Sequence, residues 1–304
     1  LIFKTIPRTS FAPADIVLGQ TDFTSSTAGS GIDKITSPDK IHTDGKRLFC
    51  SDFNNHRVLI WNTIPTANGA PANVVIGQPD FSTITSGTTP DKMNNPTGVF
   101  SDGKRLLVAD RENHRVLIWN TIPTSNGVKA DIILGESGVA GGGPTMLDSP
   151  SDVYFDGKKL FVADRNNNRI LIWNSLPLQS GTPADIVLGQ PDFSSNVANV
   201  SSRNLSFPSA IFSDQRSLYV SDQTNNRVLI WKNIPESNFA PADIVLGQPD
   251  FTTNSAGLGR NKMDTPLAIA SDGERLFVAE NTNSRLLVFN LNAGVETKLG
   301  PHFE

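Results

Sequence analysis

Residues 57–65 read Arg-Val-Leu-Ile-Trp-Asn-Thr-Ile-Pro, and this stretch decides the fold because close copies of it occur at 115–123, 169–177 and 227–235. A looser copy covers 285–291, and the tail of the stretch appears once more at 1–7. The aromatic residue of each copy falls at Phe3, Trp61, Trp119, Trp173, Trp231 and Phe289, with spacings of 58, 58, 54, 58 and 58 residues. The chain of 304 residues is therefore a tandem repeat, and we expect a single domain over 1–304.

Each repeat predicts four short β-strands. In the unit after Pro96, the first strand is expected to end at Asp102-Gly103, and the others to cover 106–110, 115–119 and 130–134. β-branched and aromatic residues dominate these segments, and an Asp-Gly pair between apolar runs is typical of a hairpin turn. Four antiparallel strands per unit, repeated radially, predict the blades of a β-propeller. An open solenoid is the alternative, but recurring Asp-Gly hairpins fit blades better.

The strand count predicts how the propeller closes. The chain supplies 22 expected strands, whereas six four-stranded blades need 24. We therefore expect an all-β, six-bladed propeller whose sixth blade is incomplete, with only its third and fourth strands present at the N-terminus. The missing pair is expected beyond Glu304, within roughly 34 further residues, because residues 299–303 look like the start of another linker. The expected blade units cover 1–23 (partial), 38–81, 96–135, 150–193, 208–251 and 266–304.

Composition excludes several classes of protein. Apolar residues make up 38% of the chain, which is enough for a core and excludes intrinsic disorder. The net charge of −4 removes the strongest sign of a nucleic-acid binder. Cys50 is the only cysteine, so neither an intramolecular disulfide nor a cysteine-based zinc site can form. No apolar run approaches the roughly 20 residues that a membrane span requires, and residues 1–10 lack the layout of a signal peptide.

Residues 162–170 read Val-Ala-Asp-Arg-Asn-Asn-Asn-Arg-Ile, and five consecutive units carry this pattern, which resembles the NHL repeat family. Units that contain Ala-Asp-Ile-Val-Leu-Gly-Gln-Pro-Asp-Phe further resemble a bacterial branch of that family, whose members are usually exported and have no assigned activity. The resemblance implies a six-bladed propeller in an extracellular or periplasmic location. It implies no particular chemistry, because this fold hosts lyases, hydrolases, RNA binders and plain scaffolds.

Residues that recur in every unit are expected to be structural. The tryptophans Trp61, Trp119, Trp173 and Trp231 are expected in the core. An acidic series has two interpretations. It is either a carboxylate ring that binds Ca²⁺, or a set of residues that each cap the turn to the third strand and pair with the arginine that follows. We favour the second; the acidic residues are Asp52, Asp110, Asp164, Asp222 and Glu280, and the arginines are Arg57, Arg115, Arg169, Arg227 and Arg285.

Histidine and cysteine offer few sites for catalysis. His56 and His114 occupy a turn position held by Asn or Ser in other units, so we expect them at positive φ. His42 lies in a first strand nearest the axis and is a candidate metal ligand, but a catalytic zinc usually needs three protein ligands. The resemblance adds that amidating-lyase members of the family depend on such a histidine set, which this chain lacks. Cys50 aligns with valines and is expected to be a buried hydrophobe, not a nucleophile. No cofactor is therefore predicted, with Ca²⁺ as the alternative.

Sequence variation concentrates in the loops that lead to each blade, at 24–37, 82–95, 136–149, 194–207 and 252–265. Loops on a rigid scaffold commonly carry binding sites. The expected binding face contains Lys34, Lys92, Arg111, Arg165, Arg203, Gln223 and Lys262. We therefore predict a non-enzymatic binding or scaffold module that docks a protein partner or a small polar ligand on this face or at the channel mouth. A metal-assisted lyase or lactone hydrolase with an axial site is the alternative, and RNA binding, which the net charge opposes, is third.

Overall fold

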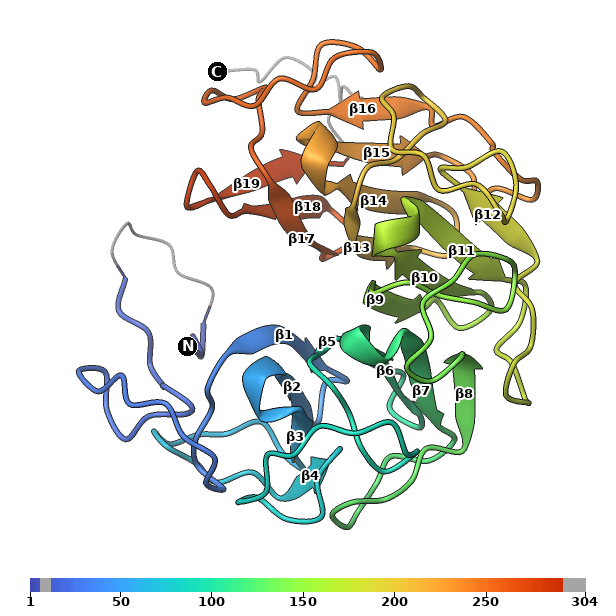
Figure 1. Ribbon diagram of the computed structural model, residues 1–304. Helices are drawn as coiled ribbons and strands as arrows, with labels where there is room; N and C mark the ends of the chain where they lie inside the picture. Colours follow the sequence, from blue (N-terminus) through green and yellow to red (C-terminus); the bar gives the residue numbers. More distant parts are fainter. Residues whose placement is uncertain (6–11, 292–304) are drawn as a thin grey trace, which may run out of the picture.

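Five antiparallel sheets stand around a common axis in the computed structural model, which describes residues 1–5 and 12–291 (Figure 1). The first strand of each sheet lies nearest the axis, and later strands lie progressively closer to the rim. Within these residues, no helix has the length and apolar composition needed to cross a membrane. The arrangement is that of a β-propeller.

The strand bounds repeat from sheet to sheet. The first sheet contains β1 (Pro38–Thr43), β2 (Leu48–Asp52), β3 (Arg57–Trp61) and β4 (Val74–Ile76). The second contains β5 (Pro96–Ser101), β6 (Leu106–Asp110), β7 (Arg115–Trp119) and β8 (Ile132–Gly135). The third contains β9 (Pro150–Phe155), β10 (Leu160–Asp164), β11 (Arg169–Trp173) and β12 (Ile186–Leu188). The fourth contains β13 (Pro208–Ser213), β14 (Leu218–Asp222), β15 (Arg227–Trp231) and β16 (Ile244–Leu246). The last described sheet contains β17 (Pro266–Ser271), β18 (Arg275–Glu280) and β19 (Arg285–Asn290).

The prediction of four-stranded antiparallel blades is confirmed, but the prediction of six blades with an incomplete sixth is wrong. The described residues form five sheets. The two N-terminal segments expected to belong to a sixth blade meet only at a single bridge between Ile2 and Ile16. Leu1 and Phe3 remain 73% and 42% exposed, and although Ile16 and Val17 are buried, the two segments together form no sheet. The linker expected at 299–303 lies outside the described residues.

The core lies between the sheets. Four apolar clusters each join the facing sides of two neighbouring sheets, from the first pair to the last. Trp173, for example, belongs to the cluster between the second and third sheets, and its indole N–H donates to the carbonyl of Thr182 at 3.0 Å. Trp61, Trp119 and Trp231 make the same bond to the residue nine positions later, at 2.9 to 3.1 Å. Each tryptophan therefore fills the core and also fixes the loop between the third and fourth strands.

A tight turn joins the second and third strands of the first four sheets. These 3-10 turns are η1 (Phe53–Asn55), η2 (Arg111–Asn113), η3 (Arg165–Asn167) and η4 (Gln223–Asn225). His56 and His114 follow the first two turns at φ 53° and 54°, which confirms the predicted turn role. Their Nδ1 atoms accept the backbone N–H groups of Asn95 and Ser149, each at 3.1 Å. Burial lowers the pKa of His56, which favours the neutral ring that can accept this bond.

The side-chain oxygens of Asn168 and Asn226 accept the equivalent N–H groups of Phe207 and Thr265, each at 2.9 Å. In the second to fifth sheets the residue before the proline that begins the first strand takes a positive φ, between 51° and 53°, at Asn95, Ser149, Phe207 and Thr265. A side-chain acceptor on one sheet therefore holds the chain where it enters the first strand of the next.

A buried ion pair joins the second and third strands of each sheet. In the third sheet Arg169 donates to Asp164 at 2.7 Å, and both side chains are fully buried. The remaining guanidinium N–H groups donate to the loop carbonyls of Gly143 and Met146, each at 3.0 Å, and to that of Phe193. Burial raises the pKa of Asp164 to about 6, because lost hydration outweighs the attraction of Arg169, so the carboxylate is still mostly charged at neutral pH.

The same pairing occurs in every sheet. Pairs with fully buried side chains join Asp52 to Arg57, Asp110 to Arg115 and Asp222 to Arg227 at 2.7 to 2.9 Å, and Glu280 pairs with Arg285 in the last described sheet. The acidic side chains do not cap the turns that follow them; instead, one oxygen accepts a backbone N–H from the loop that leads into the same sheet, as Asp164 does from Asp148. The pair therefore ties that loop to its sheet.

Arg169→Met is expected to lower the free energy of unfolding by about 3–5 kcal/mol, because it leaves the buried Asp164 carboxylate without its counter-charge. Chemical denaturation followed by tryptophan fluorescence measures the loss. Combining Arg169→Met with Asp164→Asn is expected to recover part of it. Arg285→Met is the matched control, and its cost is expected to be smaller because the Arg285 side chain is 26% exposed. Equal losses for the two arginines would contradict this explanation.

Cys50 is expected to resist thiol reagents in the folded protein. It is buried in β2, and burial raises the pKa of its thiol to about 12, so almost no thiolate is present at mildly alkaline pH. Labelling with a chromogenic disulfide reagent should be negligible for the native protein and stoichiometric in guanidinium chloride. Rapid labelling of the native protein would show that β2 opens on the timescale of the assay.

Candidate functional site

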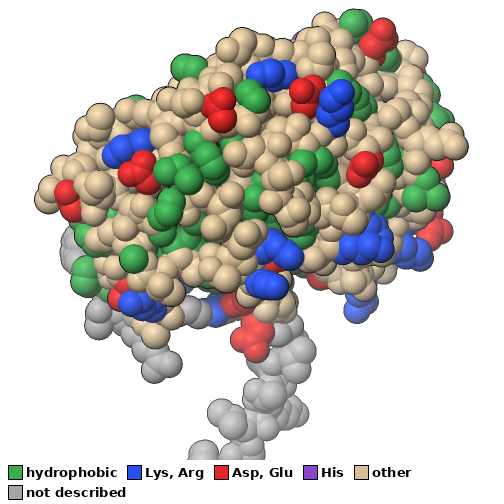
Figure 2. Space-filling model, turned by 90° about the horizontal axis from the view of Figure 1, so that it is seen from below, with side chains coloured by type: hydrophobic (Ala, Val, Ile, Leu, Met, Phe, Trp, Pro, Cys, Tyr) green, Lys and Arg blue, Asp and Glu red, His purple; other side chains and the backbone are tan. Residues whose placement is uncertain are grey.

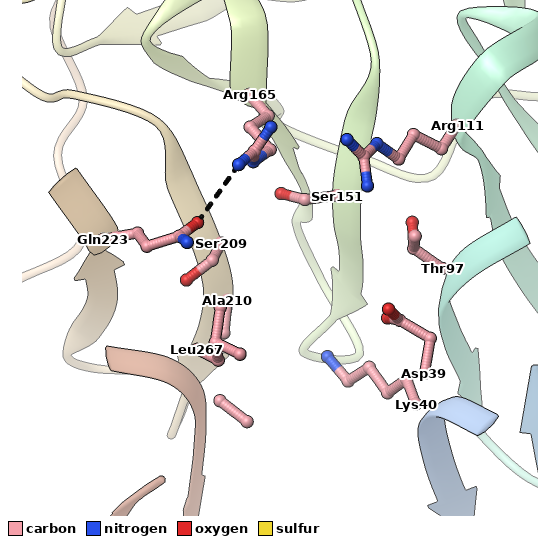
Figure 3. Close-up of a pocket in the computed structure, with 11 residues that line it drawn as sticks. Asp39, Lys40, Thr97, Arg111, Ser151, Arg165, Ser209, Ala210, Gln223 and Leu267 are labelled. Atoms are coloured by element: carbon pink, nitrogen blue, oxygen red, sulfur yellow. Dashed lines mark hydrogen bonds between the residues drawn. The ribbon is translucent and has the colours of Figure 1, made fainter. Parts of the chain in front are cut away.

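The units diverge at three positions that face the axis. The residue after the proline that begins each first strand is Asp39, Thr97, Ser151, Ser209 or Leu267. The next position holds Lys40, Gly98, Asp152, Ala210 or Ala268, and the position after each buried acid holds Phe53, Arg111, Arg165, Gln223 or Asn281. Most of these residues line one cavity of about 180 Å³ at the mouth of the axial channel (Figure 3). A recurring scaffold thus presents a non-recurring set of side chains at a single place.

Hydroxyl groups form part of the cavity wall and join neighbouring sheets. Thr97 donates to the carbonyl of Pro150 at 3.2 Å, Ser151 to that of Pro208 at 2.8 Å, and Ser209 to that of Pro266 at 3.0 Å. Each bond runs from one first strand to the next, so the wall is fixed by the packing of the sheets. Because the O–H groups are committed, the hydroxyl oxygens remain as acceptors on this wall.

Two arginines supply positive charge to the cavity. In Figure 3 the side chains of Arg111 and Arg165 reach in from the top of the view, from the turns η2 and η3. Arg165 stacks over the Phe207 ring at 4.7 Å and donates to the Gln223 side chain at 3.4 Å. Burial lowers the pKa of Arg165, and the nearby Arg111 lowers it further. Arg111 lies 5.9 Å from the centre of the Phe53 ring, and its Nε atom is 3.4 Å from the Glu112 carboxylate.

Asp39 brings a carboxylate into the same cavity, entering from the lower right of Figure 3. The side chain reaches solvent through the mouth, but the surrounding walls raise its pKa. Lost hydration is the largest cause, ahead of the opposing attraction of Arg111 and Lys40. Within residues 1–5 and 12–291, no hydrogen bond or ion pair engages this carboxylate.

An ion pair across the axis lies below the mouth. Lys40 of the first sheet pairs with Asp152 of the third, whose carboxylate is fully buried and also accepts the N–H of Ile211 at 3.0 Å. The second sheet lies between the two partners and contributes Gly98 there. A Cβ atom on Gly98 would lie 2.7 Å from the Asp152 Cα and 2.8 Å from its Oδ1, too close for any side chain. The glycine therefore makes room for the pair.

A second cavity of about 350 Å³ lies on the other side of Lys40 and is lined mainly by apolar and aromatic side chains. His42, Phe100, Tyr154 and Phe212 come from the first strands of four consecutive sheets, with ring centres 4.7, 4.9 and 5.6 Å apart. The His42 Nε2 atom lies 2.8 Å from the Ser101 carbonyl and donates to it, and Tyr154 donates to the Ser213 carbonyl at 3.0 Å. Burial lowers the pKa of His42, so the ring is neutral at neutral pH. This histidine belongs to an aromatic wall.

The structure separates the site residues expected from sequence. Arg111, Arg165 and Gln223 meet in the mouth cavity. Lys92 instead donates to Gln78, Lys262 to Ser255 of its own loop, and Arg203 to the carbonyl of Phe239, which lies between β15 and β16. Lys34 packs beside Gly29 and Gly31 in the first of those loops. The candidate metal ligands Asp52, Asp110, Asp164 and Asp222 are each bound to a separate arginine, and the described residues contain no group of three or more His, Cys, Asp or Glu side chains arranged to hold a metal ion.

Sequence reasoning missed Asp39, Lys40, Asp152 and the hydroxyl wall. The sequence did contain a sign of this site. These residues occupy the two positions after the proline that begins each first strand, where the five units differ in chemical type. The cross-axis pairing of Lys40 with Asp152 carries no such signal, since the two residues lie in units that are not neighbours.

Comparison with known proteins identifies an NHL repeat at residues 93–119, which include β5, β6 and β7. No curated protein matches the sequence. A chain of the nidogen–laminin complex is similar in structure, with 13% identity and a TM-score of 0.50 over 84% of this chain and 76% of that one. A Bacteroides uniformis protein provisionally assigned as a 6-phosphogluconolactonase matches with 15% identity and a TM-score of 0.50, over 85% of this chain and 68% of that one.

A computationally designed protein also matches, at 6% identity and a TM-score of 0.49 over 86% of this chain. The chain spans 61% of that protein's length. The likeness to the nidogen–laminin chain and to the Bacteroides uniformis protein, both below 25% identity, shows the propeller fold alone.

Gly98→Ala is expected to destabilise the protein by about 1–3 kcal/mol, because the added methyl group collides with Asp152 and forces the Lys40–Asp152 pair to move. Thermal denaturation measures the change. Ala210→Gly is the matched control at the equivalent position of the fourth sheet, where alanine is native, and should cost only about 0.5–1 kcal/mol. A Gly98→Ala protein as stable as the parent would show that the pair does not restrict this position.

Proposed function

We propose that this propeller, whose second blade carries an NHL repeat, is a binding module that holds a small polar ligand at the mouth of its axial channel through an anionic group on that ligand. The observation that carries the proposal is the convergence of Arg111 and Arg165 on a concave polar cavity at the positions where the units diverge. A propeller with an NHL repeat supports a binding or scaffold role, and the cavity gives that role a location.

Arg165 is the side chain best suited to the ligand. Its partners among the described residues are the neutral Gln223 side chain and the face of Phe207, and no acid forms an ion pair with it, although Asp39 and Glu112 attract it from further away. Guanidinium groups bind carboxylate and phosphate groups through two parallel N–H bonds. Partial burial strengthens such bonds, because the groups compete with less water.

The arginines are held in place before any ligand arrives. Arg111 and Arg165 both begin turns, and the residue that follows each turn accepts a backbone N–H at the entry of the next sheet. Each guanidinium also lies over an aromatic ring, which limits its rotation. Because these side chains are preorganised, less conformational entropy is lost on binding, which increases the affinity for a small ligand.

The distribution of charge on the outer surface fits ligand binding in one cavity better than binding of a polyanion to a large basic surface. On the one side of the molecule that Figure 2 shows, basic and acidic side chains are interspersed among uncharged atoms over the upper part, and small groups of lysine and arginine lie along the lower right. Charged residues make up only 18% of the chain. Recognition through the concave mouth therefore fits this protein better than attraction to a polyanion, which needs a concentrated basic patch.

Arg165→Gln is expected to weaken binding of small anions by about 10–100-fold, because it removes one charge-assisted pair of hydrogen bonds while copying the glutamine found at the equivalent position 223. Isothermal titration calorimetry with inorganic phosphate, acetate and a panel of small organic acids measures the affinities. Arg216→Gln, in an exposed hairpin away from the mouth, is the matched control and should bind like the parent. The proposal fails if no anion in the panel binds, or if both variants bind equally well.

A further inference from the structure

We infer that the ligand of the mouth cavity is a small zwitterion, such as a free amino acid, whose anionic group lies at Arg165 and Arg111 and whose ammonium group lies at Asp39. The inference rests on the proposed function and adds the second charge of the ligand. The cavity contains groups of both signs that the protein does not pair with each other, and a zwitterion would satisfy both.

Asp39 differs chemically from the hydroxyl residues at the equivalent positions of the next three sheets. Thr97, Ser151 and Ser209 each donate a hydrogen bond to the first-strand proline of the next sheet. A carboxylate cannot donate, so Asp39 leaves the Pro96 carbonyl without that bond and loses the structural role of the position. The same position in the last described sheet holds Leu267. Asp39 is therefore a charged residue at a position that holds a hydroxyl residue in three other sheets and a leucine in the last described one.

The nearest lysine does not neutralise Asp39. Lys40 is committed to Asp152, a fully buried carboxylate that would otherwise have no counter-charge. Arg111 is shared with Glu112, and Arg165 is held by Gln223. The walls around the exposed Asp39 carboxylate raise its pKa, and the attraction of Arg111 and Lys40 does not cancel this effect. An ammonium group from a ligand would supply the missing hydrogen bonds and charge.

The size and polarity of the cavity limit the ligand. Its volume of about 180 Å³ is smaller than the roughly 300–1,000 Å³ of sites for drug-sized molecules. The hydroxyl oxygens of the wall accept further N–H groups, whereas Ala210, Leu267 and Ala268 form an apolar side that suits a short hydrocarbon. Lys40 lines both this cavity and the aromatic one, and its pairing with Asp152 fixes it where the two adjoin.

The test compares ligands that differ by one charged group. The twenty standard L-amino acids are titrated calorimetrically into the 304-residue protein, and the tightest binder is followed by two analogues, its carboxylic acid without the amino group and its amine without the carboxylate. The zwitterion is expected to bind at least about tenfold more tightly than either analogue, because each charged hydrogen bond contributes about 1.5–3 kcal/mol.

Two variants assign the charges. Asp39→Ser copies the serine of the equivalent positions 151 and 209, so the variant should fold. Its affinity for the zwitterion is expected to fall to that for the deaminated acid. Its affinity for the deaminated acid is expected to stay the same or to increase. Arg165→Gln should weaken both. If the acid binds the parent as tightly as the zwitterion and Asp39→Ser improves both, the inference is overturned while anion binding stands. If no amino acid binds but other anions do, the inference is overturned in the same way; if no anion of any kind binds, the proposed function fails with it.

Discussion

A buried arginine is the constraint on which the rest of this propeller depends. A guanidinium group carries five N–H donors and cannot lose its charge, so burying it requires a carboxylate and several more acceptors at fixed positions. Arg57, Arg115, Arg169 and Arg227 find them in the acid of the adjacent strand and in the carbonyls of the loop that leads into the same sheet. Each sheet thus fixes its own entry loop from inside, which leaves the positions facing the axis free to differ.

Such pairs specify geometry more than they add stability. Burial raises the pKa of Asp110 and of Asp164 despite the arginine at 2.7 Å, which is the direction expected where the loss of hydration opposes the ion pair. The free energy that holds the sheets together comes from the apolar clusters between them. The ion pairs decide which loop conformation those clusters support.

Much of the fold could be predicted because its signals are local. The period between tryptophans, the Asp-Gly hairpins and the positive φ of His56 and His114 all follow from short stretches of chain, and the strands 106–110 and 115–119 match β6 and β7. The number of blades could not be predicted by counting strands, because a segment such as 1–3 resembles a strand yet pairs only where a neighbour supplies a surface. For the same reason Arg111 and Arg165 could be placed on a binding face, but Asp39 and the Lys40–Asp152 pair could not. Their meeting depends on the angle between sheets.

Gly98 fixes the place of its unit between the units that hold Lys40 and Asp152. The units look interchangeable in their recurring residues, yet the link from Lys40 to Asp152 passes over the unit between them, and only the unit with glycine at that position can lie there. Exchanging the second unit with the fourth would place Ala210 beside the pair and move Arg111 away from Asp39 of the first unit. Duplication of one unit can explain the shared frame, but the blades have since become distinct parts, each tied to its place in the ring.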